Sequence, residues 1–165
     1  MNVTKEHIGL TTERYKVDIE KGHIRRFCQA IGDTNPLFVD EEQASESAYG
    51  SIIAPLTFPI ALSDESAKLP LELDVRRMLH GEQEFIYYKP LRLGESYTAQ
   101  MKVADIYERE GKSGNMQFIV LDTELRDDND ELAVISRTNI IYRALWGGED
   151  MAITKQSIDG VAFEN

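Results

Sequence analysis

The sequence predicts an α+β fold in which an antiparallel β-sheet wraps around a central apolar helix. Three observations favour this class. Helical periodicity is confined to the first part of the chain, alternating segments separated by turn residues fill the second part, and an apolar run that begins at Pro55 is too hydrophobic to lie on a surface. A sheet that curves around this run buries the hydrophobic surfaces of both elements at once.

Length and composition are those of one globular domain. A chain of 165 residues can bury about two-thirds of the surface of its unfolded state. A hydrophobic content of 42% argues against disorder. We expect a single domain over 1–146 and a weakly patterned tail over 147–165, because Gly147-Gly148 follows the last alternating segment.

Charge and cysteine content restrict the environment and the partners. The first residues contain no apolar signal segment, and no stretch is long enough to span a membrane. The single cysteine, Cys28, cannot form an internal disulfide, so we expect a reducing, cytoplasmic location. A net charge of −11 argues against non-specific binding of nucleic acid, which requires Lys and Arg to neutralise phosphates. Any anionic ligand needs a local basic patch.

The first predicted helix spans 19–31, with Asp18 as its N-cap and Gly32 as its stop. Its apolar residues recur at helical spacing and share one face, namely Ile24, Phe27, Cys28 and Ile31. We interpret Cys28 as a structural thiol on that face.

The other side chains of this helix are assigned no role in a site. Arg25 and Arg26 point away from the apolar face. His23 borders it and is interpreted as a packing or surface residue.

A polar turn and two further helices are predicted next. Pro36 restricts the residue before it, so the chain changes direction at Asp33-Thr34-Asn35-Pro36. A short surface helix is expected over 39–49. The central apolar helix is expected over 57–68, where Thr57 caps it and Pro59 falls in its first turn.

The second half of the chain predicts antiparallel strands. Residues 96–106 show the clearest alternation, with Tyr97, Ala99, Met101 and Val103 on one face. The turns are expected at 111–115 and 127–130. The predicted strands are 82–88, 96–106, 116–126 and 132–143. Hairpins between neighbouring strands give a meander, and its free surface favours a symmetric dimer.

Three motifs in order resemble one known family, the MaoC-like hot-dog-fold hydratases and dehydratases of acyl thioesters. The resemblance is closest to the FAS1-like dehydratase N-terminal domain and to HadA-type subunits, and it extends from about Tyr15 to Arg143. The motifs are Gly-Asp-Thr-Asn-Pro-Leu at 32–37, Ile-Ala-Pro-Leu-Thr-Phe-Pro at 53–59, and His-Gly-Glu-Gln-Glu-Phe at 80–85 followed by Tyr-Lys-Pro-Leu at 88–91.

The resemblance implies a catalytic geometry that this chain only partly retains. Active members read Gly-Asp-x-Asn-Pro-aliphatic-His, where the Asp and the His activate a water and a backbone N–H stabilises the thioester oxygen. Asp33 matches the acidic residue, and the oxyanion donor maps to the N–H of Leu56, since Pro55 has none. The position of the His holds Phe38, which can neither accept nor donate a proton. The His-less branches of the family work with a second hot-dog domain or subunit.

The resemblance also implies a set of candidate site residues. The tentative catalytic groups are Asp33 and the Leu56 N–H. The candidate substrate-binding residues are Asn35, Phe38, Pro55, Thr57 and Phe58. Asp33 and Asn35 can equally be ordinary turn formers, and the apolar residues can equally be core.

A histidine and two basic pairs are the other polar residues that could belong to a site. His80 opens a predicted strand and is interpreted as structural or as part of an interface. The basic pairs Arg76-Arg77 and Lys89/Arg92 either lie on a solvated face or contact a pantetheine phosphate. No Cys/His cluster, phosphate-binding glycine loop or nucleophile elbow is present, so we expect no metal and no cofactor.

Three functional hypotheses follow. The first is an acyl-binding, non-catalytic half of an enoyl-thioester hydratase or 3-hydroxyacyl-thioester dehydratase, in a homodimer or in a heterodimer with a His-bearing hot-dog subunit. Its ligand would be an acyl-CoA or an acyl-carrier-protein thioester. The second is a self-sufficient homodimeric hydratase or thioesterase that uses Asp33. The third is a non-enzymatic acyl-binding or assembly module.

Overall fold

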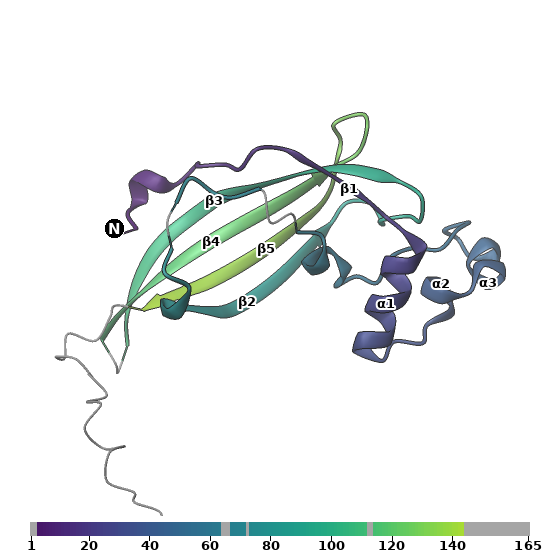
Figure 1. Ribbon diagram of the computed structural model, residues 1–165, viewed down its shortest axis with the longest axis horizontal. Coiled ribbons are helices and arrows are strands. Elements are labelled where there is room, and N and C mark those ends of the chain that lie inside the picture. The colour runs from purple at the N-terminus through teal and green to yellow at the C-terminus, as the bar shows by residue number, and fades with distance from the viewer. Residues whose placement is uncertain (1–2, 64–66, 72, 112–113, 144–165) are drawn as a thin grey trace, which may run out of the picture.

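The computed structural model describes residues 3–63, 67–71, 73–111 and 114–143, so the predicted tail over 147–165 lies outside the described residues. Its main feature is a five-stranded antiparallel sheet with the strand order β1-β3-β4-β5-β2. The three α-helices gather at one end of this sheet (Figure 1). The strands are β1 Tyr15–Asp18, β2 Met78–Tyr87, β3 Ser96–Gly111, β4 Gly114–Arg126 and β5 Leu132–Arg143.

The order of the strands differs from a simple meander at both edges. Strands β3, β4 and β5 follow one another as predicted, but β2 pairs with β5 rather than with β3. Strand β1, which was not predicted, pairs with β3 from Tyr15↔Ala99 to Asp18↔Ser96. It has only four residues, too few for alternation to be recognised in the sequence.

The inner face of the sheet carries the predicted apolar side chains. Tyr97, Ala99 and Val103 are buried, and Met101 is half-buried. A bulge between Val103 and Asp105 then shifts the alternation by one residue, so that Ile106 continues the buried row.

Helix α1 (Lys21–Ile31) begins later than predicted. Its N-cap is Glu20, and Asp18 is instead the last residue of β1, where its carboxylate accepts a hydrogen bond from Ser96 Oγ at 2.5 Å. The predicted stop is confirmed, because Gly32 adopts the left-handed conformation at φ 70°. Ile31 departs from the predicted buried face and is 51% exposed.

The single surface helix predicted over 39–49 is two shorter helices, α2 (Pro36–Val39) and α3 (Glu41–Glu46). Asp40 separates them, because its backbone is extended and its side chain accepts a hydrogen bond from Gln43 N–H as the N-cap of α3.

The long central helix predicted over 57–68 is wrong. Within the described part of this range the only helical segment is the 3₁₀ helix η2 (Phe58–Ala61). It still occupies the predicted place, because Phe58 and Leu62 are buried in one cluster with Ala99, Leu125 and Val134 of the sheet. The α+β class with an apolar segment held against the sheet is therefore confirmed, with a turn of 3₁₀ helix in place of the α-helix. Two more 3₁₀ helices are η1 (Lys5–His7) and η3 (Val75–Arg77).

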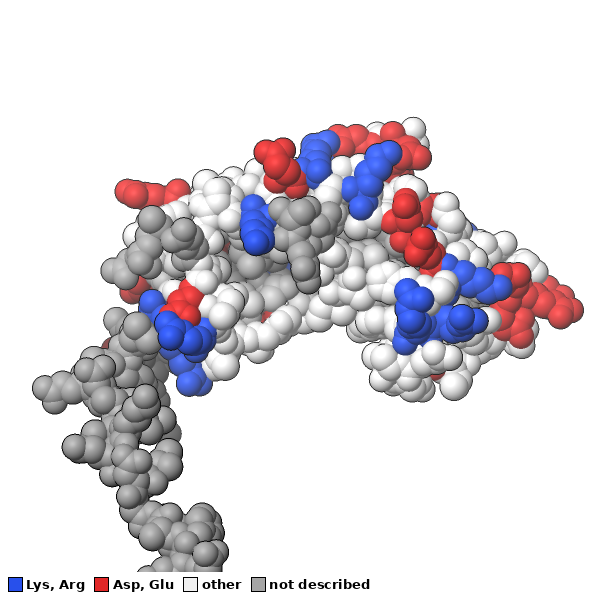
Figure 2. Space-filling view, viewed as in Figure 1, with Lys and Arg blue, Asp and Glu red and all other residues white. Residues whose placement is uncertain are grey.

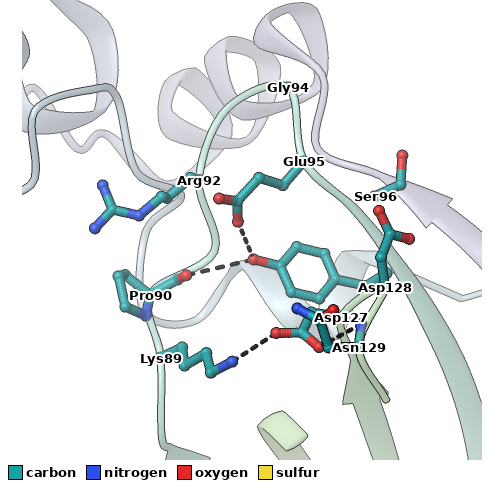
Figure 3. Close-up of a pocket in the computed structure, with 10 residues that line it drawn as sticks. Lys89, Pro90, Arg92, Gly94, Glu95, Ser96, Asp127, Asp128 and Asn129 are labelled. Atoms are coloured by element: carbon teal, nitrogen blue, oxygen red, sulfur yellow. Dashed lines mark hydrogen bonds and ion pairs between the residues drawn. The ribbon is translucent and has the colours of Figure 1, made fainter. Parts of the chain in front are cut away.

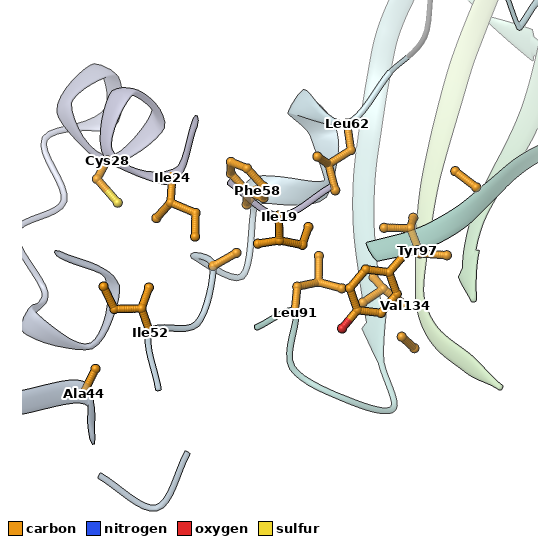
Figure 4. Packing of buried hydrophobic residues seen from close by; sticks show 14 residues of the cluster. Ile19, Ile24, Cys28, Ala44, Ile52, Phe58, Leu62, Leu91, Tyr97 and Val134 are labelled. Carbon is orange, nitrogen blue, oxygen red and sulfur yellow. The ribbon is translucent and has the colours of Figure 1, made fainter. Parts of the chain in front are cut away.

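Two hydrophobic clusters form the core. The first joins α1, η2 and the near end of the sheet through residues such as Ile24, Phe58 and Leu91 (Figure 4). The second fills the far end of the sheet around Ile106 and Ile119. The first cluster therefore fixes the helical lobe to the sheet. None of the helices in the described ranges has the length and apolar character to cross a lipid bilayer.

Candidate functional site

The polar turn after α1 is held by its own side chains. The Asp33 N–H donates to Cys28 O at 2.9 Å, and Asp33 Oδ1 accepts from the Asn35 N–H at 2.9 Å. Asn35 Oδ1 in turn accepts from the Leu37 N–H at 3.0 Å, so Asn35 caps α2. Both polar side chains thus have a structural role, as short turn-forming side chains commonly do.

The segment before η2 presents a free backbone donor. Pro55 is fully buried while Leu56 is 60% exposed, and Thr57 is also exposed. The Phe58 N–H donates to Pro55 O at 2.9 Å, but within the described residues no acceptor receives the Leu56 N–H. Burial raises the pKa of Tyr87, which stays neutral and donates its hydroxyl proton to Leu56 O at 2.9 Å. The carbonyl is therefore fixed, and the N–H is available to a ligand.

Phe38 and the η2 segment meet in the first core cluster. The Ile53 N–H donates to Leu37 O at 3.3 Å, which ties the end of the polar turn to the strand-like residues before Pro55. The Phe38 ring packs on the same cluster as Ala54 and Phe58. Phe38 is therefore a partly buried ring that packs against the core.

Asp33 does not lie where Phe38 and the η2 segment meet. It lines a cavity of about 430 Å³ with Arg25, Cys28, Gln29 and Val39, and none of residues 55–58 contributes to its wall. Burial raises the pKa of the Cys28 thiol, and the charge of Asp33 raises it further.

The two sites lie on different sides of α1. His23 and Phe27 both pack their rings on Phe58, with ring centroids at 4.8 and 5.3 Å. At 100° per residue these two positions lie about half a turn around the helix from Arg25 and Gln29. This chain alone therefore does not bring the Asp33 carboxylate and the Leu56 N–H into one cavity.

The histidines and the predicted basic pairs are engaged elsewhere. The three histidines all fall in the described ranges, and none of them lines the Asp33 cavity. Arg76 pairs with Asp74 at 2.8 Å, and Arg77 lies over the Tyr142 ring, 4.1 Å from its centroid.

Lys89 and Arg92 belong to a second cavity of about 550 Å³ between the turns at the near end of the sheet (Figure 3). Lys89 is paired with Asp127 and Glu131, and the Arg92 guanidinium donates to Tyr49 O. The Tyr97 hydroxyl donates to Glu95 in the same cavity. The charge of Lys89 is therefore already compensated by carboxylates, whereas Arg92 is bonded to an uncharged carbonyl.

Arg25 lines the Asp33 cavity, although the sequence did not predict it as a site residue. It was expected to point away from the apolar face of the helix and was assigned no role in a site, yet it forms part of the wall of the Asp33 cavity. The spacing Arg25, Cys28, Gln29, Gly32 places these residues on one face of a helix that leads directly into the Asp33 turn, and this signal was available in the sequence. No group of three or more metal-binding side chains comes together within the described ranges.

Topology and comparisons together define the class of protein. The sheet with an apolar segment against its inner face is that of the hot-dog-fold hydratases and dehydratases. R-hydratase PhaJ1 from Pseudomonas aeruginosa aligns with a TM-score of 0.62 at 17% identity over 84% of this chain and 83% of its own, and at that identity the likeness is one of fold. A truncated HadBC (3R-hydroxyacyl-ACP dehydratase) complex from Mycobacterium tuberculosis aligns with a TM-score of 0.67 at 25% identity over 82% of this chain and 96% of that chain.

Sequence comparison gives the family. The chain belongs to the FAS1-like, dehydratase domain region family, whose model matches residues 6–136. A UPF0336 protein of Thermobifida fusca (strain YX) is 34% identical over 149 residues, which cover 87% of this chain and 95% of the relative. A UPF0336 protein of Streptomyces avermitilis is 34% identical over 138 residues, covering 81% and 88%.

Proposed function

We propose that this chain is the acyl-binding, non-catalytic half of an acyl-thioester hydratase or dehydratase of fatty acid metabolism. It would act beside a hot-dog subunit that carries the catalytic histidine, in a cytoplasmic enzyme whose substrate is an acyl-CoA or an acyl-carrier-protein thioester. The observation that carries the proposal is Phe38, a core ring at the position where the reaction needs a proton carrier.

The chemistry explains why a partner is needed. Hydration of an enoyl thioester requires one group that removes a proton from water and returns a proton to the α-carbon, and a donor that stabilises the charge on the thioester oxygen. The Leu56 N–H can serve as that donor, because it is unpaired among the described residues and the segment around it is exposed. Asp33 without an adjacent imidazole supplies only a carboxylate already bound in a turn.

The edges of the sheet support association with a second subunit. The outer edge of β3 is covered by the N-terminal segment, where Gly9 and Thr12 donate to Val103 O and Met101 O at 2.9 Å. Strand β2, with ten residues, is the other edge, and no described strand pairs with its free side. Exposed edges of this length are normally covered in the assembled protein.

The proposal is tested by reconstitution. The purified chain is assayed for hydration of a short trans-2-enoyl-CoA, alone and mixed with a His-bearing hot-dog subunit from the same organism. We expect no hydration by the chain alone and hydration by the mixture. Hydration by the chain alone that Asp33→Asn abolishes, and that the exposed-loop control Asp128→Asn leaves unchanged, would overturn the non-catalytic assignment.

Product analysis separates the remaining alternatives. Free coenzyme A released by the chain alone would indicate a thioesterase, and a retained thioester with an added hydroxyl would indicate a self-sufficient hydratase. A non-enzymatic assembly module would be neither active nor stabilised against thermal unfolding by any acyl thioester.

A further inference from the structure

The cavity beside α1 has a cation in its wall that the protein's own carboxylates leave uncompensated. The chain has 29 acidic and 18 basic residues, and seven of the 16 basic residues in the described ranges have an acidic partner, as Lys21 has in Glu41 and Arg137 in Asp122. No carboxylate of the described residues lies within ion-pair distance of Arg25, although Arg25 shares the cavity with Asp33. Figure 2 shows basic side chains gathered over α1, next to the acidic surface of the other two helices.

We propose that Arg25 binds the phosphate of the pantetheine arm that carries the acyl thioester, with the phosphate seated in the cavity of Arg25, Gln29 and Asp33. The inference rests on the proposed function and adds the group through which the carrier is recognised. Both coenzyme A and a carrier protein present this phosphate.

The chemistry of the cavity fits a phosphate at one end and an uncharged arm beyond it. A guanidinium donates two parallel hydrogen bonds to phosphate oxygens, and the Gln29 amide can donate a third. The rest of the wall includes Cys28 and Val39, of which Val39 is 43% exposed and suits the apolar parts of the arm. The volume of about 430 Å³ accommodates part of such a ligand and not a whole coenzyme.

The Arg25 cavity and the Leu56 N–H lie on different sides of α1. An α-helix with its side chains is about 10–12 Å across, and the pantetheine arm is about as long as four extended residues, about 14 Å. An arm that follows the surface of α1 must cover about half of its circumference, about 16–19 Å, so the cavity holds the phosphate end of the arm and the thioester end lies beyond it. Leu56 and Ile60 are 60% and 50% exposed.

The effect of Asp33→Asn distinguishes this proposal from a catalytic role for Asp33. Its carboxylate shares the cavity and repels a bound phosphate, so Asp33→Asn is expected to tighten binding of a phosphorylated ligand. A catalytic role for Asp33 predicts instead that the same substitution abolishes turnover with no gain in affinity.

The test measures dissociation constants by isothermal titration calorimetry, on the full chain alone and in complex with its His-bearing subunit. The ligands are butyryl-phosphopantetheine and butyryl-pantetheine, which differ only in the phosphate. Arg25→Gln should weaken binding of the phosphorylated ligand about tenfold, the value of a charge-assisted pair, and leave the other ligand unchanged. Arg26→Gln is the matched control, because Arg26 is also exposed and without an ion pair among the described residues, but does not line the cavity.

The outcomes are distinguishable from failure of the proposed function. If the unaltered chain binds both ligands equally, or if Arg25→Gln and Arg26→Gln have equal effects, the phosphate site is overturned while acyl binding stands. If it binds neither ligand, both proposals fail. If only Arg25→Gln weakens binding of the phosphorylated ligand, the same titrations are repeated with butyryl-CoA and with a butyryl carrier protein. The ligand with the lower dissociation constant identifies the carrier.

Discussion

The residues of the candidate site differ in whether their hydrogen-bonding groups and rings already have partners within the fold. Asp33 and Asn35 each accept a backbone N–H of the turn that contains them. Phe38 contributes a ring to the core. Arg25 and the Leu56 N–H are among the groups near the helices for which the described residues provide no partner, and the functional proposals depend on them.

The ion pairs of Glu124 make the stability of the folded chain depend on pH. Hydrogen bonds from Lys102 at 2.7 Å, and then from Arg126 at 2.8 Å, hold the pKa of Glu124 below its ordinary value of 4.5. A lowered pKa stabilises the folded state fully above pH 4.5, and this contribution is lost as the pH falls through the folded-state value. Glu124→Gln should therefore lower the free energy of unfolding at pH 7 by about 0.5–1 kcal/mol, and the difference should shrink in acid.

Urea unfolding measured across this pH range checks the prediction. Glu110→Gln serves as the control, because Glu110 is an exposed residue of the neighbouring strand with no ion pair among the described residues. An acid dependence that is identical in Glu124→Gln and in the unaltered chain would contradict the assignment.

Asp122 is the most deeply buried charge in the sheet. Its side chain is 5% exposed and receives two hydrogen bonds from Arg137, at 2.7 and 2.9 Å. Arg137→Leu leaves this carboxylate buried without its partner, so we expect a loss of about 2–3 kcal/mol in the free energy of unfolding. The double variant Asp122→Asn/Arg137→Leu should lose less than the sum of the two single variants, and additive losses would show that the pair is not coupled.

Among the elements, α1 controls the geometry of both candidate sites. One side of the helix packs on Phe58 and another side forms the wall of the Asp33 cavity. Its C-terminal stop sets where the Asp33 turn begins. The φ of 70° at Gly32 allows the chain to leave the helix there, whereas Gly22, within the first turn, has no such requirement.

Two alanine substitutions in α1 should have opposite effects. Gly32→Ala meets no atom within 4 Å but must adopt a left-handed conformation, which should cost about 1 kcal/mol. Gly22→Ala meets only the end of the flexible Arg26 side chain at 3.4 Å, and should stabilise the chain by about 0.5 kcal/mol through helix propensity. Thermal unfolding of both variants checks the pair, and changes of the same sign would refute it.

At the scale of the whole molecule, the longest strand edge left unpaired by the described residues is the free side of β2. The helical lobe and the N-terminal segment cover one end and one edge of the sheet, which leaves this long strand open to a second chain. Leu79 of β2 is 41% exposed on this strand. Because edge pairing with a subunit of the same or a related fold would cover it, the association state is the property to measure.

Leu79→Lys is expected to weaken association without unfolding the chain, because a lysine on an edge strand opposes pairing with another strand. Val75→Lys is the control, since Val75 is 76% exposed but lies in η3 outside the strand. Sedimentation velocity should show the unaltered chain and Val75→Lys associating alike, and Leu79→Lys shifted toward monomer. Equal association of all three would exclude the β2 edge as the interface.

The sequence by itself determined the features that depend on neighbours along the chain. The bounds of β5, the turn at 127–130 and the stop at Gly32 were all predicted. Alternation, turn chemistry and a glycine at a helix end act over a few residues, so a single sequence is enough to recognise them.

Only the tertiary structure decided which of these features meet. It paired β2 with β5, shortened the central helix to η2, and put Arg25 rather than Leu56 beside Asp33. Each of these depends on contacts between residues far apart in the chain, where packing of the two clusters overrides local propensity. Hydrophobic periodicity shows that a face is buried, but it does not show what lies against that face.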